Sequence, residues 1–216
     1  SVDTIIEALP KQRQTLLFSA TYPAQITHIA KRIMQNPIQV QAQSAHHHTN
    51  IDQRFYRLAQ DALRIEAVQR LLKQHRHRAS LVFCNTKRET TQVAHALKEL
   101  GFTALALHGD LEQKQRDQTL VRFANNSASV LVATDVAARG LDISDVDMVI
   151  NFHLAKQSEV HVHRVGRTGR AGRQGVACSL LLQSEDYKFQ SLCDFLQQQF
   201  VLQDLPEIHP EQTSYK

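Results

Sequence analysis

Residues 129–135, Ser-Val-Leu-Val-Ala-Thr-Asp, decide the fold class of this chain. Their first five residues form a short apolar run rich in valine, which predicts a buried β-strand. Two polar residues, Thr134 and Asp135, follow at the point where that strand ends. Since ligands bind at the carboxyl ends of the strands in open α/β sheets, this stretch predicts such a sheet with a binding site at that edge.

Other apolar runs along the chain are followed by polar residues in the same way. They are Leu16–Phe18 before Ser19, Leu81–Cys84 before Asn85, and Ala104–Leu107 before His108 and Gly109. Two further runs, Ile38–Gln41 and Val176–Leu182, also resemble strands. Polar residues that repeatedly follow predicted strands indicate one shared binding edge.

Helical patterns lie between the predicted strands. Apolar residues recur at helical spacing on two faces, the first with Ile65, Val68, Leu71 and Leu72, the second with Val93, Leu97 and Leu100. Thr86 and Glu89 form a Thr-x-x-Glu capping box at the start of the second of these helices. Residues 112–124 and 184–200 predict two more helices. Strands that alternate with helices predict an α/β fold with parallel strands.

Residues 163–170, His-Arg-Val-Gly-Arg-Thr-Gly-Arg, carry the strongest functional signal. Arg164, Arg167 and Arg170 are three residues apart, and such positions share a face on a helical turn, so we expect them to point the same way. Guanidinium groups match phosphate oxygens, and glycines let a ligand approach the backbone closely. A polyphosphate or nucleic-acid site is therefore indicated. An exposed basic helix is the alternative that this stretch alone leaves open.

Four stretches, in order along the chain, resemble motifs III to VI of the DEAD-box ATP-dependent RNA helicases. They are Ser19-Ala20-Thr21, Val82–Asn85, Thr134-Asp135 with Arg139–Asp142, and His163–Arg170. The histidine that opens the last stretch is similar to the DEAD-box pattern, whereas DEAH and RecQ-type helicases usually carry glutamine there. The resemblance covers residues 1 to about 203. Residues 108–124 and 159–164 also resemble the bacterial DEAD-box protein A branch, which is associated with large-subunit ribosomal RNA.

The resemblance implies a RecA-like parallel sheet flanked by helices, as in the second domain of a P-loop NTPase-type helicase. The chain contains no Gly-x-x-x-x-Gly-Lys-Ser/Thr loop and no Asp-Glu-Ala-Asp sequence, which in the family lie upstream of Ser-Ala-Thr. We therefore expect residues 1–42 to be the remnant of a first RecA-like domain and residues 43–50 to be an interdomain linker. Residues 51–203 would form the second domain and residues 204–216 a tail. Adventitious metal binding is an alternative for the His46–His48 run.

The resemblance also implies ATP and Mg²⁺ as cofactors, with the magnesium ligands in the upstream domain. Arg167 and Arg170 would be the catalytic arginine fingers that reach the γ-phosphate. Arg139, Gly140 and Asp142 would complete the ATP site, with Asp142 accepting a hydrogen bond from the ribose. A helix-capping aspartate is the alternative for Asp142.

A second set of residues is implied to contact the RNA backbone: Asn85, Gly109, Arg116, Thr134 and Asp135. An ion pair on its own helix is the alternative for Arg116, and an ordinary strand end is the alternative for Asn85. Asp135 has as its alternative a structural ion pair with Arg139. A third set, Ser19, Thr21 and His163, is implied to couple the ATP state to the grip on RNA across the two domains.

Composition agrees with a nucleic-acid partner. The formal net charge is +4, and the chain has no tryptophan and few other aromatic residues. This favours contacts to phosphates and 2′-hydroxyls over stacking on bases, and hence little sequence preference. The three cysteines lack C-x-x-C spacing, which predicts buried free thiols in a reducing cytoplasm and no metal site. No apolar segment reaches the roughly 18 residues of a membrane span, and no signal peptide is recognisable.

We therefore expect the C-terminal half of an ATP-dependent RNA helicase core, inactive as an ATPase without its upstream domain. Its partners would be RNA, with ribosomal RNA implied by the branch, and the upstream RecA-like domain. Two alternatives stay open. One is a DNA-directed superfamily 2 helicase, and the other is a non-catalytic RNA- or partner-binding module.

Overall fold

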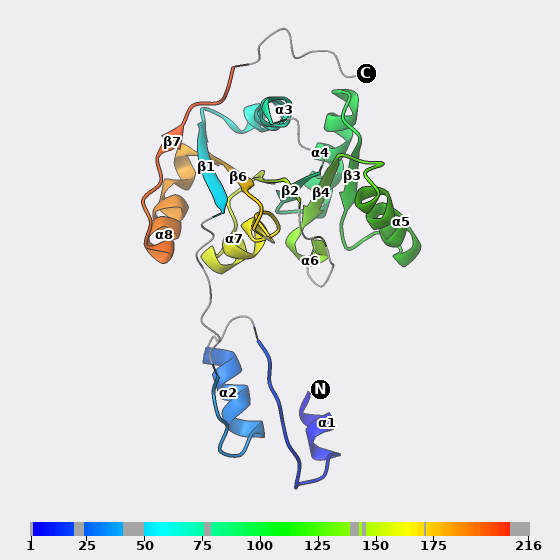
Figure 1. Cartoon of the computed structure of the whole chain (residues 1–216), viewed down its shortest axis with the longest axis vertical. Coiled ribbons are helices and arrows are strands. Elements are labelled where there is room, and N and C mark those ends of the chain that lie inside the picture. The colour runs from blue at the N-terminus through cyan, green and yellow to red at the C-terminus, as the bar shows by residue number, and fades with distance from the viewer. Residues whose placement is uncertain are drawn as a thin grey trace. The chain divides into compact units, whose positions relative to one another are not determined.

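The computed structural model describes residues 2–19, 24–40, 50–75, 79–138, 143, 146–170 and 172–207 (Figure 1). The chain divides into two compact units, Ser1–His46 and His47–Lys216. The division falls within the predicted linker, of which residues 43–49 lie outside the described residues. Four predicted site residues also lie outside them: Thr21, Arg139, Gly140 and Asp142.

The larger unit is built on a seven-stranded sheet with the order β3-β4-β2-β5-β6-β1-β7. Every pair of neighbouring strands is parallel, which confirms the predicted parallel α/β fold. The strands are β1 (Ile51–Leu58), β2 (Ser80–Cys84), β3 (Ala104–Leu107), β4 (Val130–Thr134), β5 (Met148–Asn151), β6 (Gly175–Leu182) and β7 (Leu202–Gln203). Every residue of β2, β4 and β5 is buried, as expected of central parallel strands covered on both faces.

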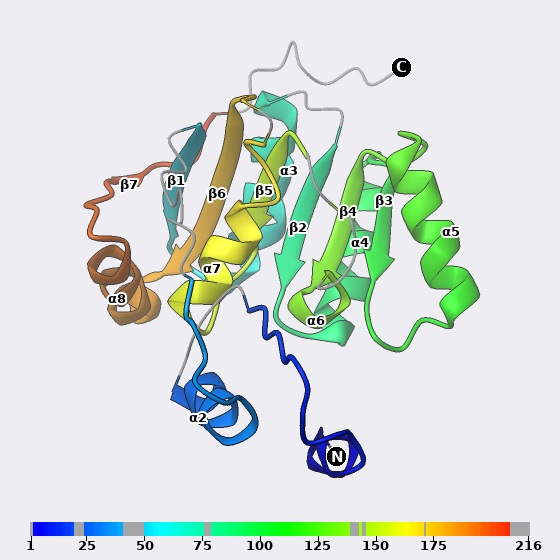
Figure 2. The same cartoon turned by 60° about the horizontal axis from the view of Figure 1, so that its bottom comes forward.

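Helices cover both faces of this sheet (Figure 2). The helices α3 (Arg64–Gln74) and α4 (Lys87–Glu99) pack on one face, where their apolar residues join Val82 and Cys84 of β2 in one core cluster. On the opposite face, Leu81 and Phe83 of the same strand join a second cluster. The helices of that face are α5 (Gln113–Ala124), α6 (Asp135–Ala138), α7 (Ser158–Val165) and α8 (Asp186–Leu196). Short 3₁₀ turns precede α3 and α8, at Asp61–Leu63 and Gln183–Glu185.

Most of the predicted elements are present, with small differences at their ends. The helix α4 begins after Thr86, whose hydroxyl accepts a hydrogen bond from Glu89 N at 3.2 Å, so this half of the predicted capping box is confirmed. The other half is not formed, because the Glu89 carboxylate accepts from Asn85 N at 3.1 Å. Leu100 follows the end of α4 and is exposed, so its predicted place on the buried face is wrong. The predicted helix 184–200 ends early, because Gln197 adopts a left-handed backbone with φ 51°.

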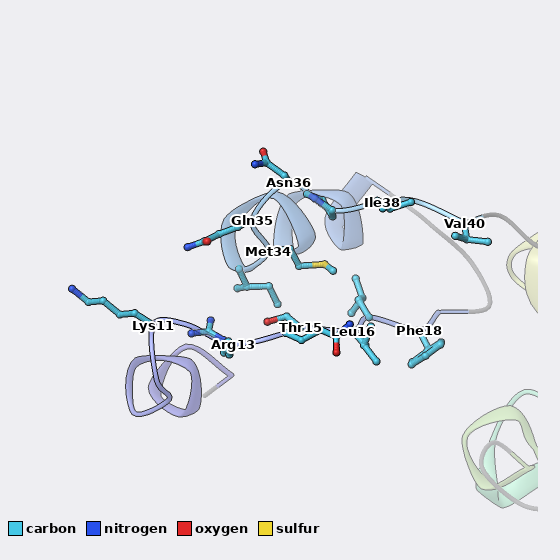
Figure 3. Close-up of a pocket in the computed structure, with 14 residues that line it drawn as sticks. Lys11, Arg13, Thr15, Leu16, Phe18, Met34, Gln35, Asn36, Ile38 and Val40 are labelled. Carbon is cyan, nitrogen blue, oxygen red and sulfur yellow. The ribbon is translucent and has the colours of Figure 1, made fainter.

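The smaller unit contains α1 (Val2–Glu7), α2 (Ala24–Ile33) and two extended runs. Neither run forms a strand in the described residues, although the sequence predicts strands at Leu16–Phe18 and Ile38–Gln41. The two runs and the end of α2 line an open groove of about 730 Å³ (Figure 3). Phe18 and Ile38 in this groove are 88% and 90% exposed, so the apolar side chains that favour strands here lack a sheet to bury them.

Candidate functional site

The buried guanidinium of Arg164, in the last turn of α7, organises the carboxyl edge of the sheet. Its Nε and Nη2 donate to the two carboxylate oxygens of Asp135 at 2.7 and 2.8 Å. Its Nη1 donates to His153 O at 2.8 Å and to Asn151 Oδ1 at 3.2 Å. Its Nη2 also donates to Asn85 Oδ1 at 3.2 Å. All five N–H donors of this side chain therefore have acceptors, which is what a buried guanidinium requires.

These contacts make Arg164 a positioning residue. The acceptors lie at or just after the ends of β2, β4 and β5, so one side chain holds three strand ends to α7. Arg164 is only 1% exposed and also lies over the ring of Phe83, with its Cζ 5.1 Å from the ring centroid. A side chain so enclosed has no donor left for a ligand. The sequence singled out Arg164 by its spacing but did not predict this internal role.

The expected common face of Arg164, Arg167 and Arg170 is wrong. The helix α7 ends at Val165, so Arg167 and Arg170 lie beyond it in a loop, which we call the arginine loop (residues 166–170). Arg164 points inward, Arg167 is partly buried and Arg170 is exposed. The alternative of an exposed basic helix is equally wrong, because only one of the three arginines is helical and that one is buried.

Thr168 anchors the arginine loop between its two outer arginines. It is 1% exposed, and its hydroxyl donates to Asp147 O at 3.1 Å. Its backbone forms a parallel bridge with Val146, just before β5. Gly169 follows with φ +68°, and a Cβ there would lie 2.5 Å from Ile51 Cγ1 at the start of β1. The loop is therefore held against the amino ends of β5 and β1.

Gly175 completes this anchor at the start of β6. A Cβ at Gly175 would lie 2.2 Å from Thr168 Oγ1 and 2.4 Å from Gly169 N. The sequence predicted that glycines here admit a ligand to the backbone. For Gly169 and Gly175 the structure gives a different reason, since their missing side chains let the arginine loop pack against the sheet itself.

The side chains of Arg167 and Arg170, both in this anchored loop, have different surroundings. Arg167 O accepts from Val146 N at 3.2 Å, which ties its backbone to the strand ahead of β5. Arg170 is exposed, and its Nε donates to Gly166 O at 2.8 Å. None of the described residues bonds its two terminal nitrogens, so the fork of donors that suits a phosphate faces solvent.

The predicted RNA-binding residues Thr134 and Arg116 hold the short helix α6. Thr134 Oγ1 accepts from Ala137 N at 3.4 Å, which caps the start of this helix. Arg116 Nη2, from α5, donates to Ala137 O at 2.7 Å. Its predicted alternative, an ion pair on its own helix, is not what the structure shows. Both side chains instead fix the segment that leads to residues 139–142.

The predicted RNA-binding residues Asn85 and Asp135 meet at Arg164, as described above. Asp135 forms its two-pronged ion pair with Arg164, and Arg139, its predicted alternative partner, lies outside the described residues. Asn85 is exposed, so its role as an ordinary strand end and its role in binding both remain compatible with its position.

Gly109 lies just after β3, the neighbour of β4, at the carboxyl edge of the sheet. It is exposed, and a Cβ built there would lie 3.6 Å from Lys87 Cε, an ordinary van der Waals distance. Lys87 in turn forms an ion pair with Asp110. The fold itself therefore does not require glycine at position 109.

The coupling residues lie in different units of the chain. Ser19 is exposed in the smaller unit, and His163 is exposed on α7 of the larger unit. Their joint role stays a prediction. The structure thus forms two groups from the predicted site, one around Arg164 at the carboxyl ends of the strands and the other on the arginine loop at their amino ends.

The described residues contain no group of three or more His, Cys, Asp or Glu placed to hold a metal. Cys84, Cys178 and Cys193 are free and buried, as predicted. Burial raises the pKa of the Cys84 thiol and brings that of Cys178 to about 12, so both stay protonated at neutral pH. No described helix has the length and apolar character needed to cross a membrane.

The comparisons with known proteins decide the family. The helicase conserved C-terminal domain matches residues 63–172, half of the chain. The DEAD-box ATP-dependent RNA helicase RhpA of Helicobacter pylori is 40% identical over 212 residues, which is 98% of this chain and 43% of that relative. The chain belongs to the DEAD-box helicases. Its larger unit is their C-terminal RecA-like domain, hereafter the helicase domain.

A second relative supports the finer branch. The ATP-dependent RNA helicase DbpA of Escherichia coli is 50% identical over 197 residues, covering 91% of this chain and 43% of that relative. This similarity is consistent with the predicted DEAD-box protein A branch. The chain spans less than half the length of these two helicases.

Solved structures confirm the fold of the helicase domain. A DEAD box protein from Methanococcus jannaschii matches with TM-score 0.66 and 39% identity, over 92% of this chain and 53% of that chain. Dbp5 of Saccharomyces cerevisiae, bound to RNA and ADP BeF₃, matches with TM-score 0.75 and 31% identity, over 90% of this chain and 52% of that chain. The predicted RecA-like architecture is therefore confirmed.

Proposed function

We propose that this chain is the C-terminal half of an ATP-dependent RNA helicase core, which couples ATP hydrolysis to local unwinding of RNA duplexes. The observation that carries the proposal is that Arg164, Arg167 and Arg170 have different burial and different contacts. Arg164 is enclosed and fixes the strand ends, while the anchored arginine loop presents Arg170 to solvent. A loop held this firmly with an outward guanidinium suits a ligand that arrives from outside the domain.

The chemistry of the arginine loop fits a nucleotide triphosphate. Arg167 and Arg170 would act as arginine fingers, and their planar forks would stabilise negative charge on the γ-phosphate. Fingers of this kind are worth about 10³ to 10⁵ in rate in other phosphoryl-transfer enzymes. Bound ATP supplies the phosphoanhydride bond that is broken, with Mg²⁺ held by the upstream domain. Arg139, Gly140 and Asp142 would hold the remainder of the nucleotide.

The carboxyl edge around Arg164 fits an RNA backbone. Asn85, Gly109, Arg116, Thr134 and Asp135 would form it, with the first two exposed for direct contact. Arg116 and Thr134 would contribute through the α6 backbone that they hold as well as directly. The similarity to Dbp5 solved with RNA and ADP BeF₃ supports this choice of ligands. Contacts of this kind read phosphates and 2′-hydroxyls, so little base preference is expected.

Coupling would come from closure of two RecA-like domains. ATP and RNA would both favour the closed state, because some contacts are available only there. Ser19, Thr21 and His163 would transmit the change between the domains. Residues 1–42 would belong to the first domain, residues 43–50 would be the linker, and the upstream half would complete the ATP site. This chain alone would not hydrolyse ATP.

The biological target belongs to the same proposal. The 50% identity to DbpA supports placing the protein in the branch associated with large-subunit ribosomal RNA, and hence in ribosome assembly in the cytoplasm. The exposed guanidinium of Arg170 favours an enzyme over a non-catalytic binding module, because a non-catalytic module would not require an arginine finger. The alternative of a DNA-directed helicase makes the opposite prediction about stimulation by nucleic acid.

ATP hydrolysis by the full-length protein, measured with RNA, with a DNA of the same sequence and with neither, tests the proposal. We expect strong stimulation by RNA, weak or no stimulation by DNA, and no turnover by residues 1–216 alone. Equal stimulation by DNA would favour the DNA-directed alternative. If no RNA stimulates hydrolysis at all, the helicase function is wrong.

A further inference from the structure

A hydrogen-bonded pair that none of the predicted motif roles includes lies next to the Arg164 cluster. His153 follows β5, and its Nε2 lies 2.6 Å from Glu89 Oε1 in the first turn of α4. Both side chains are mostly buried, at 18% and 23% exposure. Because Nε2 bonds a carboxylate, this nitrogen carries a proton and donates it. The ring of Phe152 packs edge-on against the imidazole, with centroids 5.2 Å apart and planes at 87°.

Each member of this pair makes a second contact that leads to Arg164. The backbone O of His153 accepts from Arg164 Nη1 at 2.8 Å. The other carboxylate oxygen of Glu89 accepts from Asn85 N at 3.1 Å, and Asn85 Oδ1 accepts from Arg164 Nη2 at 3.2 Å. The four residues therefore form a closed ring of hydrogen bonds, which we call the edge ring (Asn85, Glu89, His153 and Arg164).

The edge ring joins four elements, since its members come from the end of β2, the start of α4, the end of β5 and the end of α7. The pair His153–Glu89 is its only side-chain link between the β5 end and α4 among the described residues. Without the His153–Glu89 hydrogen bond, Arg164 would still bind Asp135. Within the edge ring, Asn85 and the start of α4 would then be connected to the end of β5 only through Arg164. The arginine loop begins one residue after α7, so it would inherit any shift of that helix.

Glu89 is held in its charged form within this ring. Burial alone would favour the neutral acid, but the hydrogen bonds from His153 and from Asn85 N outweigh it and hold the pKa of Glu89 below its usual value. Two donors thus face two carboxylate oxygens. An amide at position 89 would place its NH₂ against one of these donors, so glutamine is not a neutral replacement here.

We propose that His153 and Glu89 are positioning residues of the helicase domain, whose hydrogen bond sets the placement of Asn85 and of α7 and so aligns the RNA edge with the arginine loop. This inference rests on the proposed function. It predicts that loss of the pair lowers the rate of ATP hydrolysis in the closed state more than it lowers the affinity for RNA. A roughly tenfold fall in kcat with little change in KM for RNA is expected, the size typical of one charge-assisted hydrogen bond.

Variants of the full-length helicase test this inference, with RNA-stimulated ATP hydrolysis as the first readout. His153→Ala and Glu89→Ala should each lower kcat roughly tenfold, and the double variant should be no worse than either, because the two residues act as one unit. His153→Gln keeps a donor near the position of Nε2 and should recover most of kcat. The matched control is His95→Ala, which removes the exposed His95–Glu99 pair on the same helix, 3.5 Å long and 71% and 69% exposed.

Hydrogen exchange of residues 85–89 and 151–165 in the same variants gives a second readout that does not depend on ATPase activity. We expect faster exchange in His153→Ala and Glu89→Ala than in His95→Ala. Normal kcat in His153→Ala, additive losses in the double variant, or no recovery by His153→Gln would each overturn the inference. If His153→Ala fails to fold, normal kcat and exchange in Glu89→Ala would overturn it equally. If the wild-type protein shows no stimulation by RNA while exchange still responds, the proposed function fails and the positioning role stands.

Discussion

Three arginines of identical spacing meet three different environments in the folded helicase domain. Arg164 has every donor used inside the protein, Arg167 is partly buried with its backbone tied to Val146, and Arg170 faces solvent. A guanidinium without free donors can only position other residues, whereas an exposed one can meet a phosphate. The chemical role of each arginine therefore follows from where α7 ends.

Gly109 allows a prediction at the scale of a single residue. Because a Cβ there meets only Lys87 Cε at 3.6 Å, Gly109→Ala should change the free energy of unfolding by less than about 0.5 kcal/mol. If RNA passes close to this backbone, the added methyl should weaken RNA affinity about tenfold, or about 1.4 kcal/mol. The measurements are thermal unfolding and RNA titration of the full-length helicase with a non-hydrolysable ATP analogue.

The control for Gly109→Ala is Ser191→Thr, which adds a methyl group at an exposed position of α8. It should leave RNA affinity unchanged. Wild-type RNA affinity in Gly109→Ala would show that RNA does not approach this glycine. A large loss of stability would show that the position is constrained within the fold after all.

At the scale of elements, a second buried arginine joins α3 to the end of β6. Arg64 is 1% exposed, and its Nη2 donates to Glu185 Oε2 at 2.7 Å. Its Nη1 donates to Leu180 O at 3.0 Å and also to Phe152 O. Arg64 thus holds α3 to the carboxyl ends of β5 and β6, just as Arg164 holds α7 to the ends of β2, β4 and β5. This role could not be predicted from the sequence, because Arg64 belongs to no motif and is the first residue of an ordinary amphipathic helix.

The Arg64–Glu185 contact predicts a pH dependence. Burial opposes the charge on Glu185, but Leu182 N and Arg64 outweigh burial and lower the pKa of this carboxyl from its usual 4.5. A carboxyl whose pKa is lowered by folding stabilises the protein fully above about pH 4.5, and that contribution is lost as the pH falls below this value. Glu185→Gln should cost about 1.5–3 kcal/mol at neutral pH and lose less further stability on acidification.

Urea unfolding of the helicase domain between pH 3 and pH 7 checks this prediction, with Asp186→Asn as the control. Asp186 forms an exposed ion pair with Arg57, so its replacement should change stability little at any pH. Parallel curves for wild type and Glu185→Gln across the acid range would contradict the assigned cause.

How far the sequence predicts these elements depends on how much each one is decided locally. The strand β4 was predicted to within one residue, because residues 130–133 are all apolar and the polar pair Thr134 and Asp135 follows. The strand β1 was missed, because Asp52, Arg54 and Arg57 interrupt its apolar residues and resemble a loop. The end of α7 was missed as well, since it depends on the bridge of Thr168 to Val146, which only the folded sheet provides.

At the scale of the whole molecule, the helicase domain holds two groups of predicted site residues at opposite ends of one parallel sheet. The Arg164 cluster lies at the carboxyl ends of β2, β4 and β5, and the arginine loop rests on the amino ends of β5, β6 and β1. Both groups connect to the C-terminal end of α7, one through Arg164 in its last turn and the other through the arginine loop that follows Val165. This arrangement would let RNA contacts at one edge influence ATP contacts at the other. The chain spans only 43% of the length of the relatives DbpA and RhpA, and the upstream part would supply the remaining half of the ATP site.

The most direct measurement compares Arg164→Ala with the double variant Arg167→Ala, Arg170→Ala in the full-length helicase, recording melting temperature, RNA affinity and RNA-stimulated ATPase rate. The enclosed position of Arg164 predicts a stability loss of about 3–5 kcal/mol, because Asp135 is left partly buried without its partner. The double variant should keep its melting temperature and RNA affinity while its ATPase rate falls at least about 10³-fold. A double variant as active as wild type, or an Arg164→Ala protein as stable as wild type, would contradict the division of roles among these arginines.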